Sequence, residues 1–296
     1  MRIVFIGASE LGWECCRVLF ERGQNIVGIL SAPREFRISW SPSGVTNVRH
    51  RSFDDLAAAH DVPLRLMTTK MRDSAEWIAG LHPDLLVVAG WYHLIPKSML
   101  ANVPLGAVGL HNSLLPRYRG GAPLVWSIIN GESETGVTLF YLADGVDDGD
   151  IVGQQAFPIA FEDTIADVVR KAIDAAVDVV ARHVPEIALG AAPRIPQDHA
   201  TATTFPQRGP EDGLLDWNAK SARQAYDWVR AQTRPYPGAF TWRGSEKLTI
   251  WRASLLDEMA VAPPGTFVRE DAVVCADQRL LRLDEVSVGY SENRER

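Results

Sequence analysis

The stretch of sequence that decides the fold is residues 106–150, GAVGLHNSLLPRYRGGAPLVWSIINGESETGVTLFYLADGVDDGD. Its apolar run at 107–110 predicts a buried strand, and His111 and Ser113 follow at the carboxyl end of that strand. A second apolar run, 136–142, leads into an acidic loop that contains Asp147. Open α/β sheets bind their ligands outside the carboxyl ends of the strands. An imidazole and a carboxylate could therefore meet in one cleft.

The segments on either side of this stretch alternate between predicted strands and predicted helices. Strands are expected at 2–7, 26–30, 84–90 and 151–159, and an alanine-rich amphipathic helix is expected at 164–184. Alternating βα units predict an α/β fold with a doubly wound, mostly parallel sheet. The segment 31–52 shows no regular pattern, so we expect a long loop, which carries several arginines and the aromatic residues Phe36 and Trp40.

The last third of the chain has a different composition. Residues 190–213 are rich in Pro, Gly and Thr and lack periodicity, which is typical of a linker. Short strand patterns follow it and predict a small β-rich, barrel-like domain. We therefore divide the chain into a first domain at 1–189, a linker at 190–213 and a second domain at 214–296.

Composition and charge limit the class of protein. A net charge of -7 argues against extensive contact with nucleic acid. The three cysteines, Cys15, Cys16 and Cys275, have no metal-binding spacing, and we interpret them as buried residues of a protein from a reducing compartment. No signal peptide and no membrane span is recognised, so we expect a cytoplasmic protein.

The organising stretch resembles the folate-dependent formyltransferases, whose signature runs Asn-x-His-x-Ser-Leu-Leu-Pro, Arg-Gly-x-x-Pro and Leu-Asp-x-Gly-Asp. The Leu-Ile-Pro run at 94–96 and the Arg-Pro-Tyr-Pro-Gly-Ala-Phe run at 234–240 also match that family, particularly its members that act on amino sugar nucleotides. The matching residues in the organising stretch are His111, Ser113, Leu114, Leu115, Pro116, Arg119, Gly120, Pro123, Asn130, Gly131, Glu132, Thr135, Gly136, Val137, Thr138, Asp147, Asp148, Gly149 and Asp150. The resemblance implies a Rossmann-like catalytic domain followed by a β-rich, OB-like domain.

The resemblance also implies the residues of the site. His111 and Asp147 take the place of the family's catalytic imidazole and carboxylate, a pair suited to stabilising an oxyanion and moving a proton. N10-formyltetrahydrofolate is the implied formyl donor, with no metal. The residues expected to bind this donor are Trp91, Tyr92, Leu94, Ile95, Ser113, Leu114, Leu115, Asp144 and Asp148. The residues expected to bind the acceptor are Arg34, Arg37, Arg119 and Gly120.

One position departs from the signature. Gly109 stands where the family has an Asn whose side-chain amide faces the developing oxyanion. Asn112 does not replace it simply, because alternate residues of an extended segment point to opposite faces. Another donor or a water could fill the gap, the enzyme could be slow, or the protein could be a folate-binding homologue without catalysis.

The sequence does not identify the molecule that accepts the formyl group. We expect a primary amine on a small molecule, first an amino sugar nucleotide, because arginines suit phosphate groups. Methionyl-tRNA and hydroxyornithine are the alternative acceptors. Residues 205–296 carry 13 Lys and Arg against 14 Asp and Glu, which gives no basic surface for tRNA. A homodimer is also considered, and no membrane partner is expected.

Overall fold

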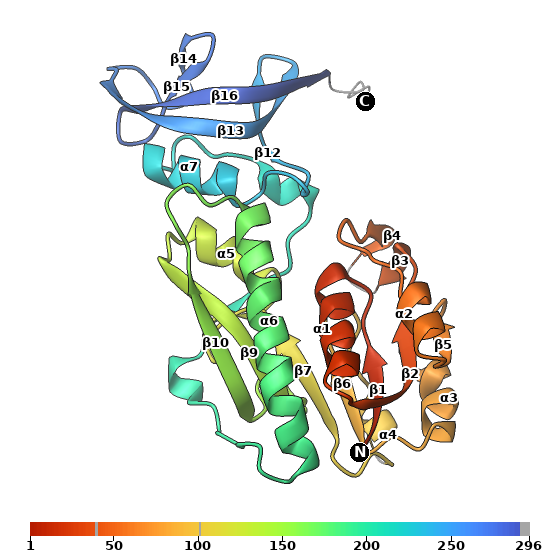
Figure 1. Cartoon of the computed structure of the whole chain (residues 1–296). Coiled ribbons are helices and arrows are strands. Elements are labelled where there is room, and N and C mark those ends of the chain that lie inside the picture. The colour runs from red at the N-terminus through yellow and green to blue at the C-terminus, as the bar shows by residue number, and fades with distance from the viewer. Residues whose placement is uncertain (39–40, 101, 291–296) are drawn as a thin grey trace. The chain divides into compact units, whose positions relative to one another are not determined.

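The computed structural model describes residues 1–38, 41–100 and 102–290. Its larger sheet has seven strands in the spatial order β10-β9-β7-β6-β1-β2-β5 (Figure 1). In chain order these are β1 (Arg2–Ile6), β2 (Asn25–Ser31), β5 (Leu64–Leu66), β6 (Leu85–Val88), β7 (Ala107–His111), β9 (Glu134–Tyr141) and β10 (Ile151–Pro158). The pairs from β5 through β7 are parallel, and β9 joins β7 antiparallel. The expected mostly parallel sheet is confirmed.

Helices cover both faces of this sheet. The α-helices within the described residues are α1 (Glu10–Glu21), α2 (Asp54–Ala59), α3 (Ala75–Gly80), α4 (Lys97–Leu100), α5 (Pro123–Ile129), α6 (Ile165–Ala188) and α7 (Ala222–Arg230), and the last of these belongs to the second unit described below. On one face, Val4 and Ile6 of β1 share a core cluster with Ile78 of α3 and Met99 of α4. On the other face, where Figure 1 shows α1 and α6, the ring of Phe5 lies 6.0 Å from that of Phe53. The predicted doubly wound arrangement is therefore confirmed.

Helix α1 shows how the sequence produces this packing. Ser9 caps its first turn by accepting a hydrogen bond from the Gly12 amide at 3.4 Å. Its apolar residues recur at helical spacing and bury Cys15 and Cys16. Burial raises the pKa of both thiols, so these cysteines are packing residues rather than reactive groups.

The expectation of a loop without regular structure at 31–52 is wrong. Strands β3 (Glu35–Ile38) and β4 (Ser41–Thr46) form an antiparallel pair, and Trp40 lies outside the described residues. The ring of Phe36 lies 5.3 Å from Tyr92 and 5.2 Å from His93. Tertiary packing of Phe36 therefore supports strands that the local pattern did not reveal.

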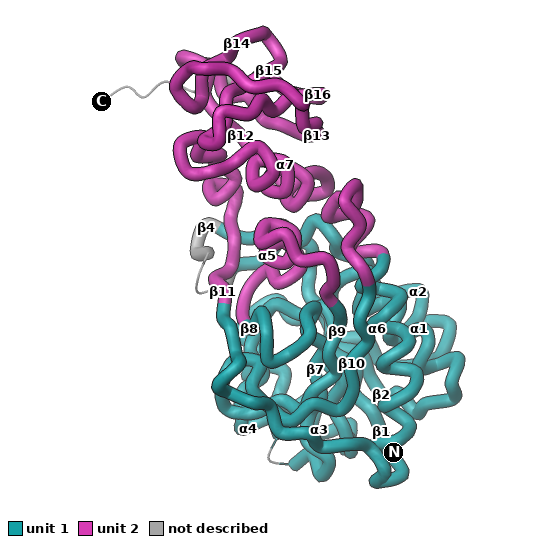
Figure 2. The backbone as a smooth tube through the Cα atoms, turned by 90° about the vertical axis from the view of Figure 1, so that its left-hand side faces the viewer, with its two compact units in different colours: residues 1–119, 136–157, 171–204 teal, residues 120–135, 158–170, 205–296 magenta. Residues whose placement is uncertain are grey.

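The chain separates into two compact units (Figure 2). The first contains residues 1–119, 136–157 and 171–204, and the second contains 120–135, 158–170 and 205–296. In the second unit α5 contacts α7, which explains why a segment before residue 189 groups with the carboxyl-terminal part. The predicted domain boundaries at 189 and 214 do not coincide with the limits of these units, and the division into a catalytic domain, a linker and a small second domain stays a prediction.

The second unit carries its own sheet, in the order β12-β13-β16-β15-β14, in which neighbouring strands are antiparallel. The strands are β12 (Ala239–Arg243), β13 (Glu246–Met259), β14 (Phe267–Arg269), β15 (Ala272–Val274) and β16 (Arg279–Tyr290). Trp217, Ala225, Val229 and Ile250 share one buried cluster, so α7 packs on this sheet. The expected β-rich second region is confirmed as a five-stranded antiparallel sheet.

The segment predicted as a linker is partly ordered. It contains the short strand β11 (Thr204–Phe205), which pairs with β8 (Arg119–Gly120), and short 3-10 turns at His199–Thr201 and Pro210–Gly213. Gln197 in this segment is only 6% exposed. A buried polar residue requires hydrogen-bond partners, and those of Gln197 lie at the candidate site.

Candidate active site

The site is built on β7, which lies between β6 and β9 in the sheet. In the strand register, Gly109 pairs with Val88 of β6 and with Phe140 of β9. His111 lies opposite Thr138 of β9. His111 ends the strand and is 8% exposed. The sequence therefore placed the imidazole correctly at the carboxyl edge of the sheet.

The structure brings His111 and Asp147 together. The Nδ1 atom of His111 lies 3.5 Å from an Oδ2 oxygen of Asp147, and its Nε2 atom lies 2.6 Å from the carbonyl oxygen of Tyr118. Because both ring nitrogens face oxygen acceptors, a proton on either nitrogen finds a partner. The geometry can thus orient an imidazole and hold it beside a negative charge.

The loop after His111 is tied to β9 by a small hydrogen-bond network. The Thr138 hydroxyl donates to the Ser113 carbonyl at 2.6 Å and accepts from the Leu115 amide at 3.1 Å. The Ser113 hydroxyl donates to the Arg117 carbonyl at 2.6 Å. Ser113 and Leu115 are buried, and the Leu114 side chain packs against Gly136. The predicted donor-binding role of these three residues stays a prediction, and their described contacts stabilise the loop.

A second loop, after β6, contains the predicted donor-binding residues Trp91, Tyr92, Leu94 and Ile95. Trp91 and Ile95 pack at the edge of the core, whereas Leu94 is 82% exposed. The Tyr92 hydroxyl donates to Asn47 at 3.2 Å. The Nε1 atom of Trp91 and the Nε2 atom of His93 are buried without a hydrogen-bond partner.

Orphaned buried groups of this kind are costly unless a ligand or water satisfies them. An indole N–H donor and an imidazole nitrogen in one loop fit a heterocycle that has both acceptors and donors, as a pterin does. Burial also lowers the pKa of His93 and so favours its neutral ring. This loop therefore fits the donor predicted from the sequence.

The acidic loop combines exposed and buried carboxylates. Asp144 forms an ion pair with Lys97 at 2.5 Å, and both side chains are mostly exposed. Asp148 packs against Gly145, and its Oδ1 oxygen is buried without a partner. Within the described residues, no cluster of His, Cys, Asp and Glu could hold a metal ion.

Arg119 is buried, with 8% of its surface exposed. Its guanidinium donates to Gln197 and contacts His199, and Gln197 in turn donates to the carbonyls of Asp147 and Gly149. Sequence reasoning missed Gln197, because a single glutamine in a segment rich in Pro and Thr carries no local signal. The predicted role of Arg119 and Gly120 in acceptor binding stays a prediction; Gly120 lies in β8 with φ of +90°.

The arginines of the segment 31–52 fall into two groups. Arg49 and Arg51 form ion pairs with Glu10 and Glu14 of α1, and the guanidinium of Arg51 also stacks on Trp13. Arg34 and Arg37 are exposed and have no ion-pair partner within the part of the chain that the structure describes. These two remain available to an anionic ligand.

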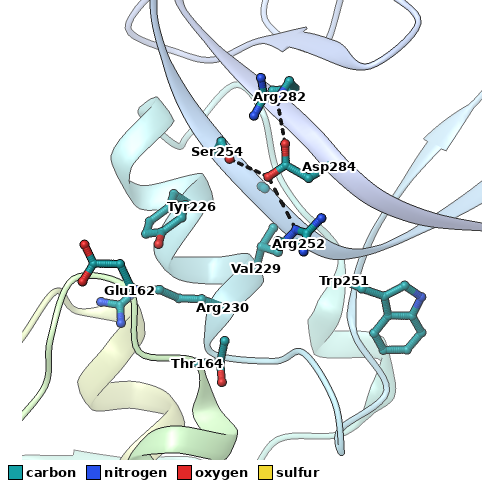
Figure 3. A pocket seen from close by; sticks show the side chains of 11 residues that line it. Glu162, Thr164, Tyr226, Val229, Arg230, Trp251, Arg252, Ser254, Arg282 and Asp284 are labelled. Atoms are coloured by element: carbon teal, nitrogen blue, oxygen red, sulfur yellow. Dashed lines mark hydrogen bonds and ion pairs between the residues drawn. The ribbon is translucent and has the colours of Figure 1, made fainter.

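A separate hollow of about 440 Å³ lies within the second unit (Figure 3). Figure 3 shows Ser254 and Arg282 turned toward Asp284, and the Arg282–Asp284 distance is 2.6 Å. Arg230 is bound to Asp227 at 2.7 Å. Two of the lining arginines, Arg252 and Arg282, thus pair with Asp284, and none of the site residues predicted above lines the hollow.

Comparison with known proteins gives two family matches. A family model described as formyl transferase matches residues 45–184, and one described as formyl transferase, C-terminal domain, matches residues 208–290. Across the described residues, no helix has the length and apolar character needed to cross a membrane.

Solved structures share the fold at low sequence identity. An N-formyltransferase from Helicobacter canadensis, in complex with folinic acid and dTDP-3-aminofucose, is 16% identical with a TM-score of 0.69, and the match covers 95% of this chain and 98% of that one. Methionyl-tRNA formyltransferase from Clostridium thermocellum is 18% identical with a TM-score of 0.61, over 98% of this chain and 100% of that one.

HypX from Aquifex aeolicus, solved with tetrahydrofolic acid, is 19% identical with a TM-score of 0.65. That match covers 98% of this chain and 46% of HypX, so the chain spans about half the length of that protein.

Proposed function

Because the chain belongs to the formyl transferase family and is an enzyme of that class, we propose that it moves a formyl group from N10-formyltetrahydrofolate to a primary amine of an amino sugar nucleotide. The observation that carries the proposal is the buried imidazole of His111 beside the carboxylate of Asp147, at 3.5 Å. Both residues occupy the family's signature positions, at the edge of the sheet where α/β proteins bind ligands.

The loop at 91–95 supports a folate donor. Trp91 and His93 each carry a buried nitrogen without a partner, and both could bind the heterocycle. The donor supplies the formyl carbon and leaves as tetrahydrofolate. The structures of the Helicobacter canadensis enzyme and of HypX were solved with folinic acid and tetrahydrofolic acid respectively, which agrees with this choice.

His111 and Asp147 perform the proton chemistry in this proposal. The amine forms a bond to the formyl carbon and loses a proton, and the folate nitrogen regains one as its bond to that carbon breaks. In this step the Nε2–H group of His111 leaves the Tyr118 carbonyl and donates a hydrogen bond toward the formyl oxygen, where negative charge develops. Asp147 orients the ring during this step.

The choice of a nucleotide sugar rests on charge. Arg34 and Arg37 are exposed, and guanidinium groups bind phosphate oxygens through paired hydrogen bonds. Residues 205–296 carry 13 basic and 14 acidic residues, which offers little attraction to tRNA. Two N-formyltransferase structures that share this fold were solved with dTDP-3-aminofucose and with dTDP respectively.

An acceptor screen tests the proposal. The protein and N10-formyltetrahydrofolate are incubated with a dTDP-amino sugar, hydroxyornithine, methionyl-tRNA or buffer alone, and formylated product is measured by mass spectrometry. We expect product with the amino sugar nucleotide. Product with methionyl-tRNA or hydroxyornithine alone would reassign the acceptor, and folate binding without any product would identify a binding protein.

A further inference from the structure

The hydrogen bonds around Arg119 converge on one glutamine. The Nε and Nη2 atoms of Arg119 lie 3.1 Å and 2.6 Å from the Oε1 oxygen of Gln197, and its Nη1 and Nη2 atoms lie 3.3 Å from the Nδ1 atom of His199. Arg119 and Gln197 are 8% and 6% exposed. Hydrogen bonds to a charged donor in a site shielded from water are stronger than those between neutral groups.

This contact determines which way the glutamine amide faces. A guanidinium can only donate hydrogen bonds, so the Oε1 oxygen of Gln197 must face Arg119. The Nε2 group is then directed to the acidic loop, where it donates to the carbonyl oxygens of Asp147 at 2.9 Å and Gly149 at 2.8 Å. A single amide thereby holds the backbone on both sides of Asp148.

The acidic loop needs such support. Asp147 has φ of +52°, in the left-handed region that residues with a Cβ atom rarely adopt. Its carboxylate lies 3.5 Å from His111, beyond the usual length of a hydrogen bond. A small movement of the loop would therefore separate the carboxylate from the imidazole.

We propose that Gln197 is a positioning residue for formyl transfer, which holds the acidic loop so that Asp147 faces His111, and that Arg119 acts by orienting the Gln197 amide. The inference rests on the proposed function for its kinetic consequence, whereas its structural part concerns His111 and can be measured without catalysis.

The variant Gln197→Met keeps the length of the side chain and removes both hydrogen-bonding groups. Gln232 offers a matched control in the second unit, because it is 7% exposed, accepts from Arg208 at 2.8 Å and donates to the Trp228 carbonyl at 3.0 Å. We expect kcat to fall about 10- to 100-fold in Gln197→Met with KM within twofold, and both constants to stay near wild type in Gln232→Met.

A double-mutant cycle separates positioning from general structural support. If Gln197 acts through Asp147, replacing Asp147 by Asn should cost much less in the Gln197→Met background than in the wild type. Equal cost in both backgrounds, or wild-type kcat in Gln197→Met, would overturn the proposal.

Nuclear magnetic resonance of the His111 ring gives a readout that needs no substrate. We expect the ring signals, assigned with a His111→Ala variant, to shift in Gln197→Met and to stay in place in Gln232→Met. Unchanged His111 signals would refute the positioning role even if the protein transferred no formyl group. Shifted signals in a protein without transferase activity would support the role and contradict the proposed function.

If Gln197→Met does not fold, Gln197→Glu replaces it. That variant keeps the acceptor for Arg119 and points an oxygen instead of a donor at the two carbonyls, so the same changes in kcat and in the His111 signals are expected at neutral pH. Wild-type kcat and His111 signals in a folded Gln197→Glu variant would likewise reject the proposal.

Discussion

The Cδ2 atom of Leu142 lies 2.7 Å from the position that a Cβ atom on Gly109 would take. A side chain at position 109 and the side chain of Leu142 would therefore need the same space. The leucine occupies the volume where the family's Asn side chain would begin. The backbone at Gly109 is outside the left-handed region, so other residues can adopt its conformation. The obstacle to an Asn here is the Leu142 side chain, whose end can move.

This contact determines how an oxyanion donor can be restored at Gly109. We expect the double variant Gly109→Asn/Leu142→Ala to have a kcat up to roughly 10²-fold above that of Gly109→Ala/Leu142→Ala, because only the Asn amide can bind developing negative charge. Both variants carry the same truncation of Leu142 and a Cβ atom at position 109, so steady-state kinetics on the pair reports the effect of the Asn side-chain amide. Equal kcat values would show that another group already serves as the donor.

Replacing either residue of the catalytic pair, His111 or Asp147, should lower kcat. We expect His111→Ala and Asp147→Asn each to lower formyl transfer by about 10²-fold or more, because the imidazole loses its proton role or its orienting charge. Asp150→Asn, in the same loop and 3.9 Å from Arg194, is the control for lost charge. Near-wild-type turnover in either folded variant would remove the pair from the mechanism.

The exposed arginines should affect acceptor binding. Replacing Arg34 or Arg37 by Ala should raise KM for a nucleotide sugar more than it lowers kcat, since phosphate contacts are made equally in the ground state and the transition state. Arg51→Ala serves as the contrast, because Arg51 pairs with Glu14 at 3.1 Å and stacks on Trp13. It should lower Tm and leave KM unchanged. Unaltered KM in both exposed-arginine variants would argue against phosphate binding by this hairpin.

The carboxylate of Asp167 at the start of α6 should make the free energy of unfolding depend on pH in the acidic range. The hydroxyl and the amide of Thr164 donate to Asp167 at 2.6 Å and 2.9 Å, and with Arg170 they lower the Asp167 pKa to about 2. A carboxyl whose pKa is depressed by folding contributes stability above its unfolded value, and this contribution is lost as pH falls toward the folded value.

Asp167→Asn should therefore reduce the free energy of unfolding by about 1 kcal/mol at neutral pH, a modest figure because the side chain is 36% exposed. The difference from wild type should shrink between about pH 4 and pH 2. Urea unfolding at several pH values measures it, with Asp174→Asn on the exposed face of α6 as the charge control. A difference that stays constant down to pH 2 would exclude the cap as its source.

The local sequence was sufficient to predict a strand or a helix wherever the spacing of apolar residues in one segment is regular. The apolar run at 107–110 and the alanine-rich pattern at 164–184 correspond to β7 and α6, because period and burial are readable from neighbouring residues. The hairpin of β3 and β4 was not predicted. Its support is the packing of Phe36 on Tyr92 and His93, more than fifty residues further along the chain.

The sequence by itself determined the doubly wound class, the family signature, the position of His111 at the end of a strand and the position of Asp147 in the loop that follows the next strand of the chain. Only the tertiary structure showed that Arg119 is turned inward, that Gln197 is buried beside it and that Leu142 fills the space next to Gly109. The reason is physical. A strand or helix follows from the spacing of apolar side chains along one segment, whereas a buried polar group is satisfied by partners that the fold brings from elsewhere. For Arg119 that partner is 78 residues away in the sequence.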